Sequence, residues 1–258
     1  MEKTSKDNLV FFMHIPKTAG TTLHQIIRQQ YGEEQIFRAY IGVGAATLQE
    51  HINNLRFRLD QENNQNQEIK LILGHVGFGL HEILGRDLTY ITFLRHPIDR
   101  VISWYYHQQR IPSAKYYQEC QSLSLKELIT RYQPIPTDNH QTRFVAGDTL
   151  REKLGLSNTI DYGYCNQELL NQAKENLKKY FLVVGIQENF DDSLSLLQKS
   201  LGWQNISYAK ENIGENKQVI SQSEISFLQE HNYWDIELYE YAKKLFQQQL
   251  NQLPRMSS

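Results

Sequence analysis

Residues 11–25, FFMHIPKTAGTTLHQ, place a lysine, a glycine and three threonines in a short loop that follows an apolar run. Backbone amides of a tight loop, together with the positive end of a following helix, bind anions such as phosphate and sulfate. Lys17 adds a mobile positive charge, and Gly20 permits a close approach of the backbone. The pattern predicts a phosphate- or sulfate-binding loop made of Lys17, Thr18, Ala19, Gly20, Thr21 and Thr22.

The position of the lysine separates this loop from an ATP-binding P-loop. Lys17 comes three residues before Gly20, whereas the pattern GxxxxGK[ST] places the lysine directly after the glycine. The lysine and the Mg²⁺-binding hydroxyl are therefore not where P-loop chemistry needs them. Two alternatives stay open at this point: a P-loop kinase, and a strand–turn–helix in which Thr21 or Thr22 merely caps the helix and Lys17 is solvated.

A second loop with anion-binding residues lies within residues 92–106, TFLRHPIDRVISWYY. Arg95 ends an apolar run, and Ser103 comes about two turns along the helix that Pro97 is expected to start. A guanidinium binds phosphate strongly, and a serine hydroxyl is able to share its oxygens. Two such loops on one sheet predict a ligand with two separated phosphate-like ends. The alternative is that Arg95 pairs with Asp99.

The elements that must position these loops alternate between strands and helices. Four apolar runs are too short for helices and rich in branched or aromatic side chains, as is typical of buried parallel strands. They are residues 8–14, 69–75, 89–95 and 180–186. Helical patterns cover residues 20–31, 97–109, 166–178, 190–201 and 221–250. The alternation predicts an α/β fold, with residues 1–258 forming a single P-loop-like three-layer domain whose central parallel sheet is flanked by helices.

The composition of the chain limits the kinds of partner and compartment that are expected. The chain has 258 residues, 22% of them charged, and its net charge of −2 gives no basic field for nucleic acid or membrane surfaces. Its two cysteines favour a reducing compartment over a disulfide framework. The N-terminus lacks an apolar signal segment, and no apolar run approaches the roughly 20 residues of a membrane span. We therefore expect a cytoplasmic protein with no membrane span and no nucleic-acid partner.

The two loops, in this order, resemble those of PAPS-dependent sulfotransferases. HIPKTAGTT followed by FLRHPIDRVISWYY is similar to the branch that contains heparan sulfate and dermatan/chondroitin sulfate 2-O-sulfotransferases and their bacterial relatives. Counterparts in the same order exist for GHVGFGLHE (74–82), DNHQTRFVAGD (138–148), FLVVGIQENFDDSLSLLQKSLGW (181–203) and DIELYEYAKKLF (235–246). The resemblance implies the sulfotransferase fold. It also implies that the first loop holds the 5′-phosphosulfate, and the second the 3′-phosphate, of 3′-phosphoadenosine 5′-phosphosulfate (PAPS).

The reaction that the resemblance implies is transfer of a sulfuryl group to an acceptor hydroxyl, which leaves 3′-phosphoadenosine 5′-phosphate (PAP). Lys17 is expected to stabilise charge on the departing phosphate, so that no metal is needed. A histidine is the side chain best suited to accept the hydroxyl proton near neutral pH. His75 ends the run KLILGH and matches the GHV base of the family, which makes it the expected catalytic base.

Three further residues are expected on the acceptor side. His14 directly precedes the first loop, while Asn139 and Arg143 belong to a segment whose family counterpart lies near the acceptor. Packing under the first loop is the alternative for His14, and an internal ion pair is the alternative for Arg143. A polar segment at 210–218 corresponds to one that often closes over the nucleotide or the acceptor. We expect a bacterial-type enzyme that acts on a sugar, glycan or small hydroxylated metabolite. A nucleotide-binding module that has lost turnover is the alternative of a different class.

Overall fold

The computed structural model describes residues 9–40, 47–61, 68–133, 136–208 and 219–252. Within them the central element is a sheet of five parallel strands: β1 (Val10–Met13), β2 (Ile36–Ala39), β3 (Leu71–Gly74), β4 (Thr89–Leu94) and β5 (Phe181–Ile186). The strand order is β2-β3-β1-β4-β5. Nearly all strand residues are buried, because helices flank the sheet, and the strands therefore read as continuous apolar runs. The structure confirms the predicted α/β fold with a parallel sheet.

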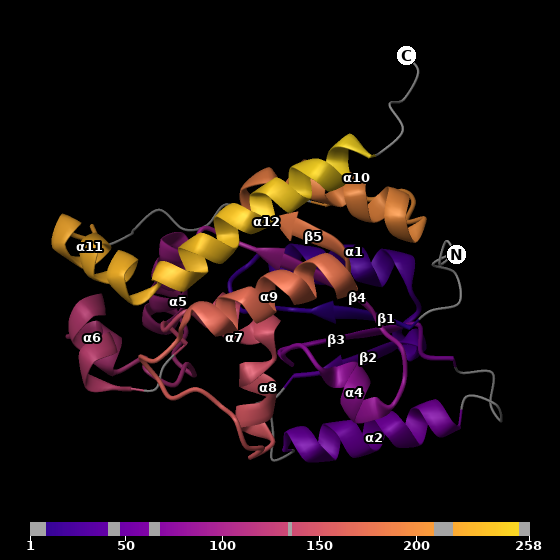
Figure 1. Cartoon of the computed structure of the whole chain (residues 1–258), viewed down its shortest axis with the longest axis horizontal. Helices are drawn as coiled ribbons and strands as arrows, with labels where there is room; N and C mark the ends of the chain where they lie inside the picture. Colours follow the sequence, from indigo (N-terminus) through magenta and orange to yellow (C-terminus); the bar gives the residue numbers. More distant parts are fainter. Residues whose placement is uncertain (1–8, 41–46, 62–67, 134–135, 209–218, 253–258) are drawn as a thin grey trace.

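Helices connect the strands and cover the sheet (Figure 1). They are α1 (Gly20–Gln30), α2 (Leu48–Asp60), α4 (Leu80–Leu84), α5 (Pro97–Arg110), α6 (Leu125–Arg131), α7 (His140–Ala146), α8 (Asp148–Lys153), α9 (Gln167–Tyr180), α10 (Phe190–Leu201), α11 (Gln222–His231) and α12 (Tyr233–Asn251). Short 3₁₀ turns lie at Glu33–Gln35, Glu119–Gln121 and Gln187–Asn189. The long helix α12 runs across α9 and beside β5, while α2 lies at the opposite edge beside β2. No helix among the described residues is both long and apolar enough to span a bilayer.

The predicted strands and helices lie close to where the sequence placed them, with one exception. The helix expected over 221–250 is wrong as a single element, because Asn232 separates α11 from α12. The buried Asn232 donates both its backbone N–H and its side-chain amide to the Leu228 carbonyl, at 2.9 and 3.0 Å, which ends α11. In the first turn of α12, the backbone N–H of Asp235 donates to Oδ1 of Asn139 at 3.0 Å.

The buried apolar side chains form two clusters. The larger surrounds the sheet and includes the inner faces of α1, α2, α9, α10 and α12. The smaller joins α5, α6 and α11, and Trp104 and Tyr105 of α5 lie within it. Burial of these faces is the main stabilising term of the fold, at about 25 cal/mol per Å² of apolar surface. It fixes α5 against α11, next to the loop that follows β4.

The strand order creates a crevice between β1 and β4. From β1 the chain passes to β2 at one edge of the sheet, and from β4 it passes to β5 at the opposite edge. In open α/β sheets, ligands bind at the carboxyl ends of adjacent strands whose connections diverge in this way. The loops after β1 and β4 therefore lie side by side, and the end of β3 is next to β1.

Candidate active site

The loop after β1 is held in an uncommon backbone conformation. Lys17 and Ala19 have positive φ angles of 75° and 68°, which few residues other than glycine adopt. Between them, Thr18 is fully buried, and its hydroxyl donates to the Ile15 carbonyl at 2.8 Å. The Thr18 hydroxyl is thus used to hold the loop in shape.

Helix α1 begins without a side-chain cap. Its N-cap residue is Ala19, and its first turn contains no acidic side chain. Thr21 is exposed and Thr22 partly buried, and neither is the N-cap, so the alternative of a capping threonine is wrong. The first amides of a helix have no intrahelical partner and carry the positive end of its dipole. The start of α1 therefore suits an anion.

Behind this loop lies a cluster of polar rings. A Cβ at position 20 would come within 2.0 Å of Cε1 and Nε2 of His14, so only glycine fits beneath this imidazole. His14 is 7% exposed, and in the described part of the chain its Nε2 has no hydrogen-bond partner. Its Nδ1 lies 3.3 Å from the Tyr40 hydroxyl, which also hydrogen-bonds Nε2 of His24. Among the described residues, no three His, Cys, Asp or Glu side chains are arranged to hold a metal ion.

His75 follows β3 and faces this cluster. Its ring centroid lies 4.5 Å from that of His14 and 4.8 Å from that of Tyr40. Nδ1 of His75 donates to the His14 carbonyl at 2.8 Å. Because a carbonyl only accepts, the proton sits on Nδ1 and the Nε2 lone pair is free to accept another. Burial lowers the pKa of His75 to about 4, against the opposing effect of the His14 carbonyl, so the ring is neutral at neutral pH.

The Lys17 ammonium lies among other cations. Burial, and then the charges of Arg110 and Arg95, lower its pKa to about 8. Within the described residues the structure gives it no acidic partner. The Nη1 group of Arg95 donates to the Lys17 carbonyl at 3.3 Å, so the two loops touch. The Lys17 and Arg95 cations thus lie close together, and such a cluster of positive charge fits an anionic ligand.

Arg95 and Ser103 lie on the β4 side of the crevice. Asp99, the predicted alternative partner of Arg95, has its carboxylate 3.5 Å from Nδ1 of His96, and its charge, like that of Glu188, also acts on the Arg95 guanidinium. Ser103, His107 and Arg110 recur at intervals of four and three residues, so they share one face of α5. Burial and then the charges of Lys17 and Arg110 lower the pKa of His107, which indicates that this face is turned toward the first loop.

Arg143 is engaged inside the protein. It is buried, with its Nη1 2.5 Å from an Asp148 carboxylate oxygen and its Nη2 2.7 Å from one of Asp138. The same nitrogens donate to the Ile160 and Asp161 carbonyls, and Nε donates to Asp138. All five N–H groups of a guanidinium are used in this arrangement. The structure therefore favours the internal ion pair, the alternative to an acceptor contact.

Asn139 is likewise used within the fold. Its amide nitrogen donates to the Asp138 carboxylate at 2.9 Å and to the His231 carbonyl at 3.0 Å, while its Oδ1 accepts from Asp235. These bonds join the start of α7 to the junction of α11 and α12. Asn139 thus orders the helices beside the crevice. The predicted polar segment at 210–218 lies outside the described residues.

We expect Arg143→Ala to lower the free energy of unfolding by about 3–5 kcal/mol, because it leaves two buried carboxylates without their counter-charge. Urea unfolding followed by circular dichroism measures the change. Arg131→Ala, at the exposed end of α6, is the matched control and should stay within about 0.5 kcal/mol of the parent protein. An Arg143→Ala protein of unchanged stability that had lost activity would instead point to an acceptor contact.

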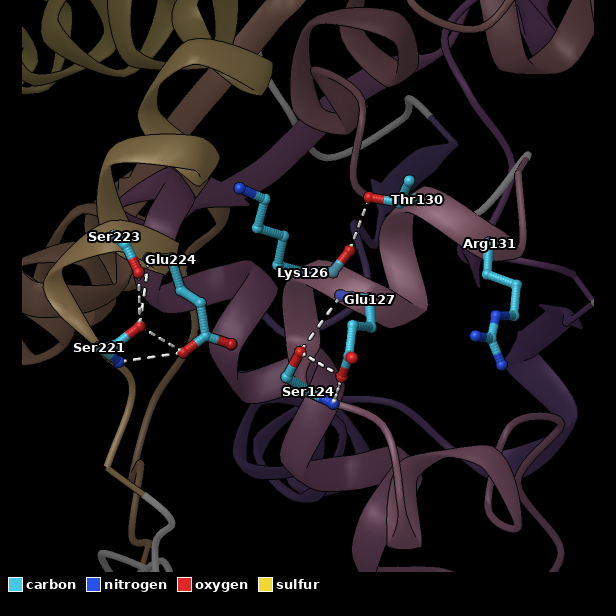
Figure 2. A pocket seen from close by; sticks show the side chains of 8 residues that line it. All are labelled: Ser124, Lys126, Glu127, Thr130, Arg131, Ser221, Ser223 and Glu224. Atoms are coloured by element: carbon cyan, nitrogen blue, oxygen red, sulfur yellow. Dashed lines mark hydrogen bonds between the residues drawn. The ribbon is translucent and has the colours of Figure 1, made fainter.

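A groove of 490 Å³ lies apart from this site, between α6 and α11 (Figure 2). It is lined by Ser124, Lys126, Glu127, Thr130, Arg131, Ser221, Ser223 and Glu224. Two capping boxes use hydroxyls and carboxylates of this groove, Ser124 with Glu127 and Ser221 with Glu224. Because two of its hydroxyls and two of its carboxylates already cap helices, and none of its lining residues belongs to the loops after β1, β3 or β4, the groove is separate from the candidate site.

Three residues in or near the candidate site were not predicted from the sequence. His24 lies four residues after Gly20, one helical turn away, and this spacing was a usable signal. Tyr40 follows β2, a four-residue strand that the sequence did not reveal. Arg110 sits on the same face of α5 as Ser103, and the shared helical face could have pointed to it.

Known proteins resemble this chain along most of its length. The family model described as galactose-3-O-sulfotransferase matches residues 2–257. Human heparan-sulfate 6-O-sulfotransferase 2 is 26% identical over 275 residues, which cover 94% of this chain and 45% of that protein. Mouse heparan-sulfate 6-O-sulfotransferase 3 is 28% identical over 185 residues, covering 63% of this chain and 39% of that protein. The chain thus spans less than half the length of these two relatives.

A solved structure also resembles this chain, with a lower sequence identity. The crystal structure of mouse sulfotransferase SULT7A1 complexed with PAP aligns with a TM-score of 0.42 and 11% identity, over 87% of this chain and 63% of that one. The matches do not single out the 2-O branch, so the narrower resemblance is not supported. Since the family model spans nearly the whole chain, the protein belongs to the galactose-3-O-sulfotransferase family.

Proposed function

We propose that the protein transfers a sulfuryl group from PAPS to a hydroxyl of a carbohydrate acceptor. One observation supports this proposal. The imidazole of His75, whose Nε2 is able to accept a proton, lies at the same sheet edge as the Lys17 and Arg95 cations, and among the described residues Lys17 has no acidic partner. They follow the adjacent strands β3, β1 and β4. A base beside a double anion site is the minimum that group transfer from a nucleotide to a hydroxyl requires.

The two charged ends of the donor suit the two loops. The uncapped start of α1 and the positive φ angles of Lys17 and Ala19 favour the 5′-phosphosulfate at the first loop. Arg95 and Ser103 favour the 3′-phosphate at the second. When bound, the donor supplies the sulfuryl group, with PAP as the leaving group.

The side chains have separate tasks in this proposal. His75 accepts the acceptor's hydroxyl proton at Nε2, while its Nδ1–H keeps its bond to the His14 carbonyl and steadies the imidazolium that forms. Lys17 stabilises the negative charge that grows on the phosphate side, an interaction that is stronger in the transition state than in the ground state. The buried His14 packs its ring over Gly20 of the first loop and beside the His75 ring. Its carbonyl accepts the bond from His75, so His14 positions both the loop and the base.

A sugar hydroxyl is the proposed acceptor, because the matching family is described by galactose and the relatives by heparan sulfate. The test incubates the purified protein with ³⁵S-labelled PAPS, in the presence of a chelator, and separate panels of galactosides, heparan sulfate oligosaccharides and small alcohols. We expect label on a carbohydrate. PAP binding without transfer to any panel would support the inactive module, and Mg²⁺-dependent ATP turnover would support the kinase.

A further inference from the structure

The backbone of Arg95 is held by one side chain. Gln141 is fully buried, and its amide oxygen accepts from the Arg95 backbone N–H at 3.0 Å. Its amide nitrogen donates to the Arg95 carbonyl at 2.9 Å. A single carboxamide thus pairs with both polar backbone groups of Arg95, as a neighbouring strand would.

Among the described strands, none pairs with the backbone of Arg95. The ladder between β4 and β5 ends with Leu94 opposite Ile186, and the pairing of β4 with β1 ends at Ile91. Arg95 is thus the first residue beyond the ladder. Backbone groups at a buried strand end need partners, and unpaired ones cost about 1–3 kcal/mol. Gln141 supplies those partners and extends the fixed part of the backbone by one residue.

Gln141 is itself fixed from the other side. The backbone N–H groups of Gln141 and Thr142 donate to the carboxylate of Asp235 at 3.1 and 2.7 Å, and the Thr142 hydroxyl donates to it at 2.8 Å. Asp235 is fully buried on α12. The first turn of α7 is therefore tied to α12, which leaves Gln141 little freedom to move.

We propose that Gln141 is a positioning residue for the nucleotide, one that sets where the Arg95 guanidinium lies relative to the first loop. Because Arg95 also donates to the Lys17 carbonyl, the position of its backbone fixes the spacing between the two anion sites. Gln141 thereby tunes the preference for a nucleotide that carries a 3′-phosphate. This inference rests on the proposed role of Arg95 in binding that phosphate.

The test compares the affinities of PAP and adenosine 5′-phosphate, measured by calorimetry, for the parent protein and for Gln141→Met, Arg95→Ala and the double variant. We expect Gln141→Met to weaken PAP binding about tenfold and to leave adenosine 5′-phosphate binding nearly unchanged. In the Arg95→Ala background, the same replacement should cost little further, because both changes act on one contact. Gln167→Met, the same replacement at the exposed start of α9, is the control and should keep the preference for PAP.

Several outcomes would overturn the inference. Equal loss of affinity for both nucleotides, or full additivity with Arg95→Ala, would show that Gln141 only supports the fold. If Gln141→Met fails to fold, Gln141→Asn serves instead, since its carboxamide is one methylene shorter and cannot pair with both backbone groups of Arg95; an unchanged PAP preference in that variant counts against the proposal. An Arg95→Ala protein with an unchanged preference would overturn the 3′-phosphate assignment as well, whereas a strong Arg95 effect without a Gln141 effect overturns this inference alone.

Discussion

Replacing His75 by alanine should reduce sulfuryl transfer by about 10²–10⁴-fold, the usual worth of a positioned general base, while PAP affinity stays nearly unchanged. The expectation follows from the tautomer: the bond from Nδ1 to the His14 carbonyl leaves Nε2 as the one basic atom of this ring. Single-turnover rates with labelled donor measure the chemical step, and calorimetry with PAP measures donor binding.

A second histidine provides the control for this variant. His51 lies on α2, far along the chain from the loops at the strand ends, and its Nδ1 contacts the Thr47 carbonyl of its own helix. His51→Ala should therefore retain full transfer. If His75→Ala kept more than about a tenth of the parent rate, the base would have to be sought elsewhere, with His14 as the nearest imidazole.

The lowered pKa of His75 also determines how kcat/KM for the donor depends on pH below 7. With a pKa of about 4, the ring is neutral and able to accept a proton at pH 6, where an ordinary histidine is already largely protonated. The kcat/KM for the donor should thus stay level as the pH falls from 7 to about 5.5, and decline only below that. A decline centred near the ordinary histidine value would indicate that another group titrates.

Local pattern was sufficient to place the strand ends that carry the site. The runs that became β1, β3 and β4 are apolar enough to be buried, and each ends directly before a polar residue or loop, so Lys17, His75 and Arg95 could be assigned to one edge of the sheet. The break at Asn232 was not foreseen, because helical periodicity continues on both sides of it.

The partners of the polar residues could not be read from local pattern. Arg143 stands between Asp138 and Asp148, five residues away on either side, a spacing that matches neither helix nor strand contacts. The clamp of Gln141 on Arg95 joins residues 46 positions apart. Such pairs depend on how α7 packs against α9 and α12, which the sequence does not encode locally. The acceptor contact expected for Asn139 and Arg143 came from the family resemblance, and in the structure both side chains bond to groups within the fold.

Replacing Lys17 by alanine is the second change with a large expected effect, a loss of about 10²–10³-fold in kcat, comparable to removal of one donor that stabilises developing charge. The ammonium has no acidic partner among the described residues, so its charge is available for a bound anion. Lys178→Ala, at an exposed position of α9, is the matched control and should leave kcat unchanged. A Lys17→Ala protein that lost PAP affinity without losing kcat would mean that Lys17 only binds the donor.

The dependence of the rate on pH is a second test of Lys17. With a pKa of about 8 in the free protein, the side chain is a cation below that pH and neutral above it, so the kcat/KM for the donor should fall as the pH rises through 8. Arginine stays charged over this range, and Lys17→Arg should therefore abolish the alkaline decline, whatever rate it retains. The anionic donor raises the pKa of Lys17 when bound, so the decline in kcat itself should begin at higher pH than the decline in kcat/KM. If the alkaline decline persisted in Lys17→Arg, the titrating group would be another residue and the assignment of Lys17 to the departing phosphate would fail.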